Sequence, residues 1–261
     1  MSNLDGHRPP PDGHILQELG FAPVRTGDEM HGSALVSPQM WVPGTTRLRT
    51  SILATWADHA SGLLAVELLA PRVPVTLELD VHAYQQPPGD GGIRAVARTV
   101  KAGRSIVVCS VDFTDDDGAP IALGTASFMA APDPRLTMPP GITLSDAMPE
   151  PGERLRVPFA QRARCERREP GVAVLHRSDD GLNSAKTVNG GLVALAVEEA
   201  ALSVTPRATL CSIAVRYLRP VRVGPAVASA EVLAGLGRVE VRDAGSEDRL
   251  AVVATTRTFD R

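Results

Sequence analysis

The sequence predicts an α+β fold in which one unit, a long helix followed by an antiparallel β-sheet, occurs twice. Each half of the chain carries one mostly apolar helix pattern and then four β-rich runs separated by turn residues. Six prolines between residues 132 and 151 break any regular element between the halves. We therefore expect two similar domains that pack against each other.

In the first half, the helix pattern has apolar residues at helical spacing until Pro71 ends it. The β-rich runs after it are separated by Pro-Gly, Ala-Gly and acidic turns. A short helical turn and an extended segment are expected before it. The elements expected are a turn at 15–19, extended chain at 30–42, the helix at 51–69 and strands at 75–84, 93–101, 105–113 and 121–128.

The second half repeats this order. Strands are expected at 157–165, 171–176, 210–217, 226–234, 238–243 and 250–259, with the helix pattern directly after Gly190 and Gly191. The stretches rich in proline and glycine then predict the domain organisation. It consists of a disordered arm at 1–14, one domain at 15–130, a semi-extended proline-rich linker at 131–156 and a second domain at 157–261.

The two halves also align residue by residue, which indicates a tandem duplication. The offset between matched residues drifts slowly along the chain, as small insertions at turns would produce. The matched pairs are Asp58 with Glu198, Ala60 with Ala200, Pro71-Arg72 with Pro206-Arg207, Tyr84 with Tyr217, Pro87 with Pro220, Gly103-Arg104 with Gly237-Arg238 and Phe128 with Phe259.

The composition argues against several classes of partner. A formal net charge of -3 leaves no excess of positive charge to neutralise the phosphates of a nucleic acid. The 3 cysteines are widely spaced and odd in number, which indicates reduced thiols in a cytosolic protein. The polar first residues lack the apolar core of a signal peptide, and no stretch is expected to reach the length of a membrane span. We expect a cytoplasmic protein with no membrane partner.

A candidate active site lies where Gly190 and Gly191 precede a helix that is apolar nearly all round. Glycines at a helix N-terminus leave bare amide N–H groups that suit a polarised oxygen. On their own, however, the two glycines also fit an ordinary tight turn. The same helix carries Glu198 and Glu199, and an unpaired buried carboxylate costs on the order of several kcal/mol.

The spacing favours Glu198 as the functional carboxylate. It lies eight residues after Gly190, a little over two helical turns, so we expect both to face the same substrate. Glu199 is about 100° away around the helix, so only one of the two glutamates can face that site. The alternative for either glutamate is a solvated helix face or a pairing with an arginine.

In these residues the sequence resembles the tandem (double) hotdog-fold proteins of the acyl-CoA thioesterase superfamily, of the PaaI-like kind. The resemblance rests on Asn183 seven residues before Gly190, on the Gly-Gly pair, and on Glu198 eight residues after Gly190. It covers about residues 20–130 and 157–261. It implies that each half is a long central helix wrapped by a curved antiparallel sheet, and that the halves pack as a pseudo-dimer.

The resemblance also implies a function, the hydrolysis of an acyl-CoA thioester to a free acid and CoA, as in fatty acid metabolism. No cofactor is expected beyond the CoA of the substrate, and the double-hotdog chains are expected to form a homo-oligomer. The Gly190 amide would bind the oxyanion, Glu198 would act as general base or nucleophile, and Asn183 would orient the water or the thioester. Asp58 is the candidate for a second catalytic carboxylate. The candidate substrate-binding residues are Gly191, Asn189, Thr50, Ser51 and, for the phosphates of CoA, Arg219.

The sequence departs from the family pattern at several positions. Asn189 stands where the family has a His. The first half has Arg49-Thr50-Ser51 in place of the Gly-Gly pair and Pro43 in place of the Asn. Thr and Ser still present backbone N–H groups, so the sequence leaves open whether one or both of the pseudo-symmetric sites are active.

Two other functions fit the same fold. An enoyl-CoA hydratase-like enzyme would need an Asp and a His that face one substrate. The neighbouring Asp58 and His59 are separated by the helical angle, so we expect His59 to be structural. A non-catalytic protein that binds acyl-CoA or lipid is favoured by the incomplete first-half motif.

Overall fold

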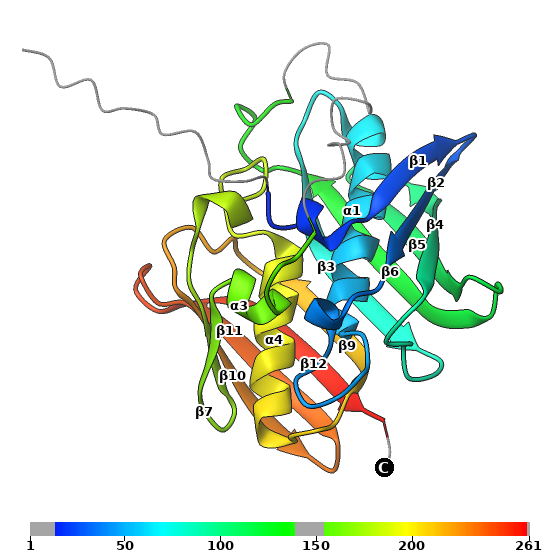
Figure 1. Cartoon of the computed structure of the whole chain (residues 1–261). Coiled ribbons are helices and arrows are strands. Elements are labelled where there is room, and N and C mark those ends of the chain that lie inside the picture. The colour runs from blue at the N-terminus through cyan, green and yellow to red at the C-terminus, as the bar shows by residue number, and fades with distance from the viewer. Residues whose placement is uncertain (1–13, 139–153, 260–261) are drawn as a thin grey trace, which may run out of the picture.

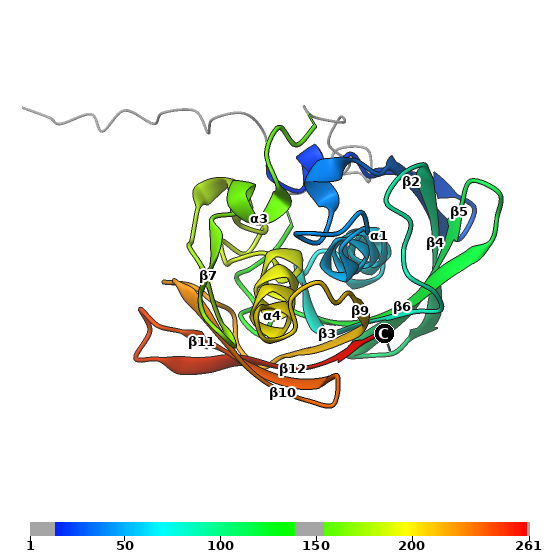
Figure 2. The same ribbon diagram turned by 60° about the horizontal axis from the view of Figure 1, so that its bottom comes forward.

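A computed structural model describes residues 14–138 and 154–259, and its two long helices lie inside one curved, twelve-stranded antiparallel sheet (Figure 1). The helices are α1 (Thr50–Leu69) and α4 (Gly190–Val204). Figure 2 looks nearly along both helices and shows them side by side, with the sheet curving around them. This arrangement confirms the α+β prediction of two helix-plus-sheet domains packed as a pseudo-dimer.

The helix and the four strands predicted after it in the first half are present, but the extended chain predicted at 30–42 is extended as β2 only to Leu35. Residues 38–40 form a 3-10 turn instead, because proline suits the first position of a helical turn. One further strand, β1, was not predicted, and it contains Pro23, which usually argues against a strand. It is tolerated because β1 lies at the edge of the sheet, where one side of the strand needs no hydrogen-bond donors. The first half contains η1 (Gln17–Leu19), β1 (Ala22–Thr26), β2 (Glu29–Leu35), η2 (Pro38–Met40), β3 (Pro74–Ala83), β4 (Gly92–Ala102), β5 (Ile106–Asp115) and β6 (Pro120–Ala130).

In the second half, the strand predicted at 157–165 is wrong. Residues 159–162 form one helical turn, because Phe159 and Ala163, four residues apart, are both buried on one face of it. The strand begins only at Cys165. The second half contains α3 (Phe159–Arg162), β7 (Cys165–Glu169), β8 (Val172–Leu175), η3 (Asp179–Gly181), β9 (Leu210–Tyr217), β10 (Ala226–Leu233), β11 (Leu236–Asp243) and β12 (Arg249–Thr258).

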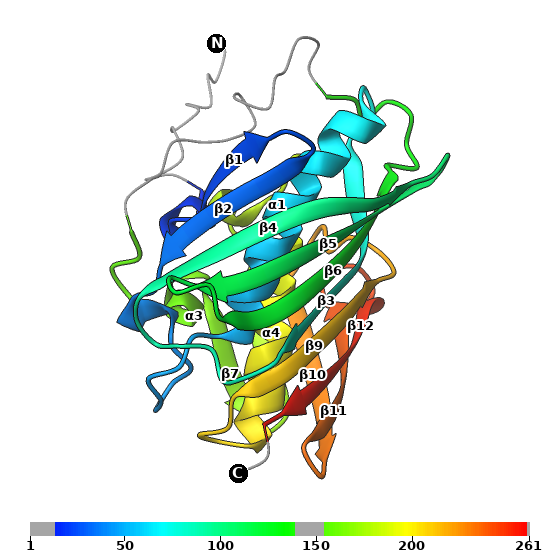
Figure 3. The ribbon, with the colours of Figure 1, turned by 90° about the vertical axis from the view of Figure 1, so that its right-hand side faces the viewer.

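The order of the strands reflects the internal repeat. The sheet runs β1-β2-β4-β5-β6-β3 through the first half and β9-β12-β11-β10-β8-β7 through the second, so β3 and β9 form the seam (Figure 3). At this seam Glu78 pairs with Arg216 in register, and the Arg216 guanidinium contacts the carboxylates of Glu78 and Asp80. The arm predicted at 1–14 and much of the linker predicted at 131–156 lie outside the described residues, so the domain bounds stay predictions.

The α1 helix corrects one expectation about membranes. It has 20 residues and a mean hydropathy of 1.2, which is enough length and apolarity to cross a membrane. Most of its side chains, however, are buried against the sheet and α4. A buried core helix of a soluble protein passes the same test of length and composition, so α1 is weak evidence of a span.

The two helices are in close contact at Gly191. A methyl group built at this glycine would lie 2.4 Å from the Thr55 hydroxyl oxygen and 2.9 Å from the Thr55 Cβ. Thr55 is β-branched and its hydroxyl donates to the Ser51 carbonyl at 2.8 Å, so it cannot move aside easily. Gly191 is therefore needed for helix packing.

We expect Gly191→Ala to lower the free energy of unfolding by about 1–3 kcal/mol, as overpacked cores do. Chemical denaturation measures this loss. Gly62→Ala in α1 is the matched control, because its methyl group would meet nothing closer than 3.8 Å and should be tolerated. Adding Thr55→Ala to Gly191→Ala should restore only part of the loss, because it removes the hydroxyl and methyl contacts but keeps the Thr55 Cβ at 2.9 Å. Equal stability of the two single variants would contradict this account.

Candidate active site

A cavity of about 890 Å³ lies between the two halves of the chain. Its walls come from α1, the loop before α4, the start of α4 and both seam strands, so neither domain forms it alone. Apolar side chains dominate, and several polar groups interrupt them. The polar and charged residues that line it include His14, Gln17, Thr55, Asp58, His59, Thr76, Asp133, Asn183, Asn189, Tyr217, Arg219 and Arg222.

Asp58, from the middle of α1, faces the start of α4. A methyl group built on Gly190 would lie 3.4 Å from Asp58 Oδ2, which puts the carboxylate next to the glycine backbone. The other carboxylate oxygen, Oδ1, accepts a hydrogen bond from the Thr76 hydroxyl at 2.8 Å. Burial raises the pKa of Asp58 to about 6, and the Thr76 hydrogen bond opposes this rise. A carboxyl with this pKa is a base at neutral pH that can also return a proton.

The first turn of α4 offers an amide to the cavity. Asn189 is the N-cap residue, and its side-chain oxygen accepts a hydrogen bond from the Gly191 amide at 2.8 Å. The Gly191 amide is therefore occupied. Among the residues that the structure describes, none accepts a hydrogen bond from the Gly190 amide, which lies at the positive end of the helix dipole.

Asn183 also lines the cavity, as its predicted role requires. Its side-chain oxygen is used within its own loop, because it accepts from the Ala185 amide, the Thr187 amide and the Thr187 hydroxyl. These bonds fix the side chain, and its NH₂ group remains as a donor.

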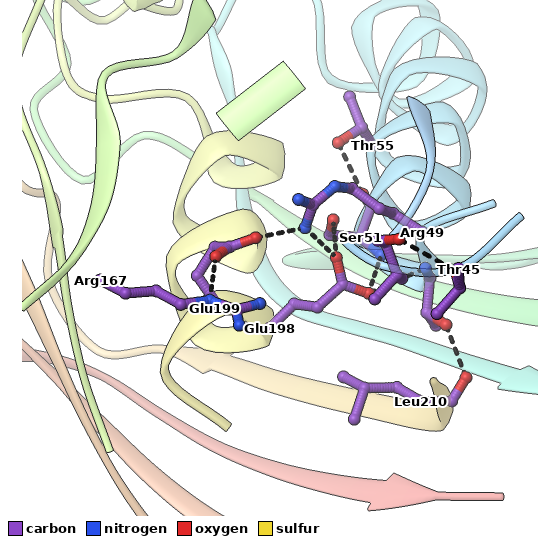
Figure 4. Close-up of polar contacts among 10 residues, drawn as sticks. Thr45, Arg49, Ser51, Thr55, Arg167, Glu198, Glu199 and Leu210 are labelled. Atoms are coloured by element: carbon purple, nitrogen blue, oxygen red, sulfur yellow. Dashed lines mark hydrogen bonds and ion pairs between the residues drawn. The ribbon is translucent and has the colours of Figure 1, made fainter. Parts of the chain in front are cut away.

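The prediction that Glu198 and Gly190 face one substrate is wrong. Glu198 is 0% exposed, and its side chain lies against the start of α1 (Figure 4). Asp58 lies in the same way against the start of α4. Its carboxylate accepts hydrogen bonds from the Thr50 amide at 2.9 Å, the Ser51 amide at 3.3 Å and the Ser51 hydroxyl at 2.7 Å. Thr50 and Ser51, predicted to bind substrate, bind this carboxylate instead.

Helix geometry explains the error. Eight residues along one helix separate the backbone of Gly190 from that of Glu198 by about 12 Å, too far for both to hold one thioester. Each carboxylate instead meets the N-terminus of the other helix. The structure therefore brings Asp58 together with Gly190, Asn189 and Asn183, and it sets Glu198 apart with Thr50 and Ser51.

An ion-pair cluster fills the pseudo-symmetric position around Glu198. The Arg49 guanidinium is 0% exposed and contacts Glu198 at 3.1 Å and Glu199 at 2.5 Å, and Arg167 contacts the other oxygen of Glu199 at 2.5 Å (Figure 4). Burial alone would lower the pKa of Arg49, but the two carboxylates raise it above its ordinary value. We call the surroundings of Asp58 and of Glu198 the two half-sites. The buried, charged arginine fills the space beside Glu198, so the Glu198 half-site has no room for a substrate.

Two further residues near the cavity have defined surroundings. Arg219 lines it and donates to the Leu250 carbonyl at 3.2 Å. His59 lines it too, with its ring edge-on to Phe21. Burial, with a smaller contribution from His14, lowers the pKa of His59 to about 4, so the ring is uncharged at neutral pH.

Sequence reasoning missed two residues of this site, Thr76 on β3 and Tyr217 on β9. Tyr217 donates a hydrogen bond from its hydroxyl to the Gly190 carbonyl at 2.9 Å. Its match with Tyr84 in the repeat was a signal of symmetry only, and nothing in the sequence marks Thr76. Among the described residues, no group of three or more His, Cys, Asp or Glu side chains could hold a metal ion.

The two helices inside one curved sheet, with a cavity shared by both halves, define a tandem hotdog protein. Residues 51–122 match the family model of the thioesterase superfamily, and residues 178–259 match the model of the acyl-CoA thioesterase N-terminal domain. The chain therefore belongs to the thioesterase superfamily and is a hydrolase that acts on thioester bonds.

Solved structures share this fold over most of the chain. The 12:0-ACP thioesterase from Umbellularia californica has a TM-score of 0.64 and 12% identity, over 91% of this chain and 100% of that one. An acyl-ACP thioesterase from Bacteroides thetaiotaomicron has a TM-score of 0.62 and 13% identity, over 89% and 98%. A putative thioesterase II from Thermobifida fusca has a TM-score of 0.57 and 16% identity, over 96% and 99%. No curated protein matches the sequence significantly.

Proposed function

We propose that this chain hydrolyses acyl-CoA thioesters in the cavity between its two halves, with Asp58 as the general base. One observation carries the proposal: the Asp58 carboxylate lies against the backbone of Gly190, whose amide has no acceptor among the described residues. A base and an oxyanion donor are the two groups that thioester hydrolysis needs. They come from different domains, so the pseudo-dimer is required for the reaction.

The reaction follows from these positions. Asp58 takes a proton from a water molecule as the water oxygen attacks the thioester carbonyl carbon. The Gly190 amide donates to the resulting oxyanion, and the Asn183 NH₂ group holds the water or the carbonyl oxygen. When the C–S bond breaks, Asp58 returns the proton to the leaving sulfur. The products are a free carboxylic acid and CoA with its thiol restored.

The surroundings of the cavity support CoA as the carrier. Arg219 and Arg222 line the cavity, and guanidinium groups suit phosphates. The apolar walls suit the acyl chain, which the volume of about 890 Å³ can hold in part. The solved relatives from Umbellularia californica and Bacteroides thetaiotaomicron are named as acyl-ACP thioesterases, so the carrier must be tested directly.

Thiol release from a panel of acyl-CoA substrates with short, long and aromatic acyl groups tests the proposal. The same acyl groups on acyl carrier protein form the second arm. We expect turnover of at least one acyl-CoA with a higher kcat/KM than its carrier-protein counterpart. Binding of CoA in a thermal-shift assay without hydrolysis of any substrate would support a non-catalytic binding protein instead.

The pH dependence of hydrolysis gives a second prediction. Because Asp58 acts as a base with a pKa of about 6, kcat/KM should rise with pH through about 6 and then level off. Thr76→Val removes a hydrogen bond that lowers this pKa, so the rise should move to higher pH. Thr125→Val on β6 is the control, because Thr125 is outside the cavity lining. An unshifted profile in Thr76→Val would contradict the assignment of the base.

We also propose a cytoplasmic location, a role in fatty acid metabolism and assembly of the chains into a homo-oligomer. The charge balance and the cysteines support the first, since none of the three cysteines forms a disulfide. The PaaI-like subtype stays a prediction. Size-exclusion chromatography with light scattering tests the oligomeric state.

A further inference from the structure

The direction of the Gly190 amide depends on what holds the backbone in the first turn of α4. Gly190 and Gly191 have no side chains, so their backbone can rotate more freely than that of any other residue type. An oxyanion donor acts only if its N–H points at the place where charge develops. The Gly190 N–H belongs to the Asn189–Gly190 peptide, whose carbonyl oxygen accepts hydrogen bonds from the Leu192 and Val193 amides at 3.1 Å. The helix therefore holds one side of the Gly190 Cα, and the peptide on its other side needs a contact of its own.

The structure holds the peptide group between Gly190 and Gly191 at both ends. Its carbonyl oxygen accepts a hydrogen bond from the Tyr217 hydroxyl at 2.9 Å. Its N–H donates to the side-chain oxygen of Asn189 at 2.8 Å. A peptide unit is rigid, so these two bonds fix the second side of the Gly190 Cα and, together with the bonds to the Asn189 carbonyl, restrict rotation about it.

The surroundings of Tyr217 hold its hydroxyl in contact with the Gly190 carbonyl. It lies at the end of β9, at the seam with β3, and its backbone is held by pairing with Val252 of β12. A methyl group built on Gly190 would lie 3.1 Å from the tyrosine oxygen, so the ring fits closely against the glycine. Burial, with the nearby charges of Asp58 and Asp80, raises the pKa of Tyr217 well above its ordinary value, so the hydroxyl keeps its proton and stays a donor.

We propose that Tyr217 is a positioning residue, which holds the Gly190–Gly191 peptide through its carbonyl and so aims the Gly190 amide at the oxyanion. This inference rests on the function proposed above. Tyr217 acts through the backbone and touches no reacting atom. It links the seam of the pseudo-dimer to the geometry of the active site.

Steady-state kinetics of Tyr217→Phe test the proposal, with Tyr84→Phe as the matched control. Tyr84 is the other tyrosine of the chain, sits directly after β3 and is 63% exposed. We expect Tyr217→Phe to lower kcat about tenfold or more with KM changed less than about twofold, because misplaced donors lose transition-state binding. The rise of kcat/KM near pH 6 should stay where it is, since the base is intact. Tyr84→Phe should match the wild type.

Amide hydrogen exchange gives a readout that does not depend on activity. Peptides covering residues 188–193 should exchange faster in Tyr217→Phe than in the wild type or Tyr84→Phe, while the rest of α4 is unchanged. Unchanged kcat and unchanged exchange in Tyr217→Phe would overturn the positioning role while leaving the proposed hydrolysis intact. If the wild type hydrolyses no thioester, the proposed function fails, and exchange alone decides whether Tyr217 holds this peptide.

Discussion

Asp58→Asn is expected to lower kcat by at least about a hundredfold, with little change in KM, because it removes the base that activates water. Asparagine keeps the shape of the side chain and can still accept the Thr76 hydrogen bond. The loss would then reflect the missing negative charge. Thiol release under saturating substrate, at a pH above 7 where Asp58 is ionised, measures it.

The stability of Asp58→Asn separates lost chemistry from lost folding. In the wild type the folded state holds the Asp58 proton up to a pH of about 6, against about 4 for an unfolded chain. The folded state binds more protons between these values, so this group lowers stability as pH rises through them, and the full cost remains above pH 6. Asp58→Asn lacks this cost and should unfold at a higher temperature than the wild type at pH 8.

Glu198→Gln is the matched variant in the second half, since Glu198 aligns with Asp58 in the repeat. Its carboxylate contacts Arg49 and the start of α1, away from the cavity. We expect its kcat to stay within about twofold of the wild type at temperatures where it is folded. A hundredfold loss in Glu198→Gln with full activity in Asp58→Asn would exchange the roles that we give to the two carboxylates.

The contrast between these two residues also marks the limit of sequence reasoning. Periodicity identified both helices and nearly all strands, because each pattern reports burial of a local face. The residue types of the site were also accessible, since Gly190 and the two aligned carboxylates carry their chemistry in the sequence. Which carboxylate meets which helix start depends on how the two domains pack, and spacing within one helix does not contain that information.

The departures in the first half have a similar explanation. Arg49 looked like a lost glycine position, but it is the cation that fills the second half-site. Glu199 was the weaker candidate for catalysis because of its angle on the helix, and that angle points it at Arg49 and Arg167. Thr76 and Tyr217 reach the cavity from the two seam strands, and only the pairing of β3 with β9 brings them there.

The second large effect is expected from Arg49→Met, which should lower the free energy of unfolding by about 3 kcal/mol or more. Methionine preserves much of the buried volume but leaves Glu198 and Glu199 without their shared cation, and breaking a buried pair from one side costs about 3–5 kcal/mol. The hydrogen bonds from Thr50 and Ser51 to Glu198 remain, which favours the lower end of that range. Denaturant unfolding measures the loss.

Arg47→Met is the control for this variant, because Arg47 lies two residues earlier on the exposed surface and should change stability by less than about 0.5 kcal/mol. Combining Arg49→Met with Glu198→Gln should cost less than the sum of the single changes, since the double variant buries one uncompensated charge fewer. Strict additivity, or a stable Arg49→Met, would mean that the cluster does not join the two domains. Folded Arg49→Met should still hydrolyse thioesters, because the Asp58 half-site does not contain Arg49.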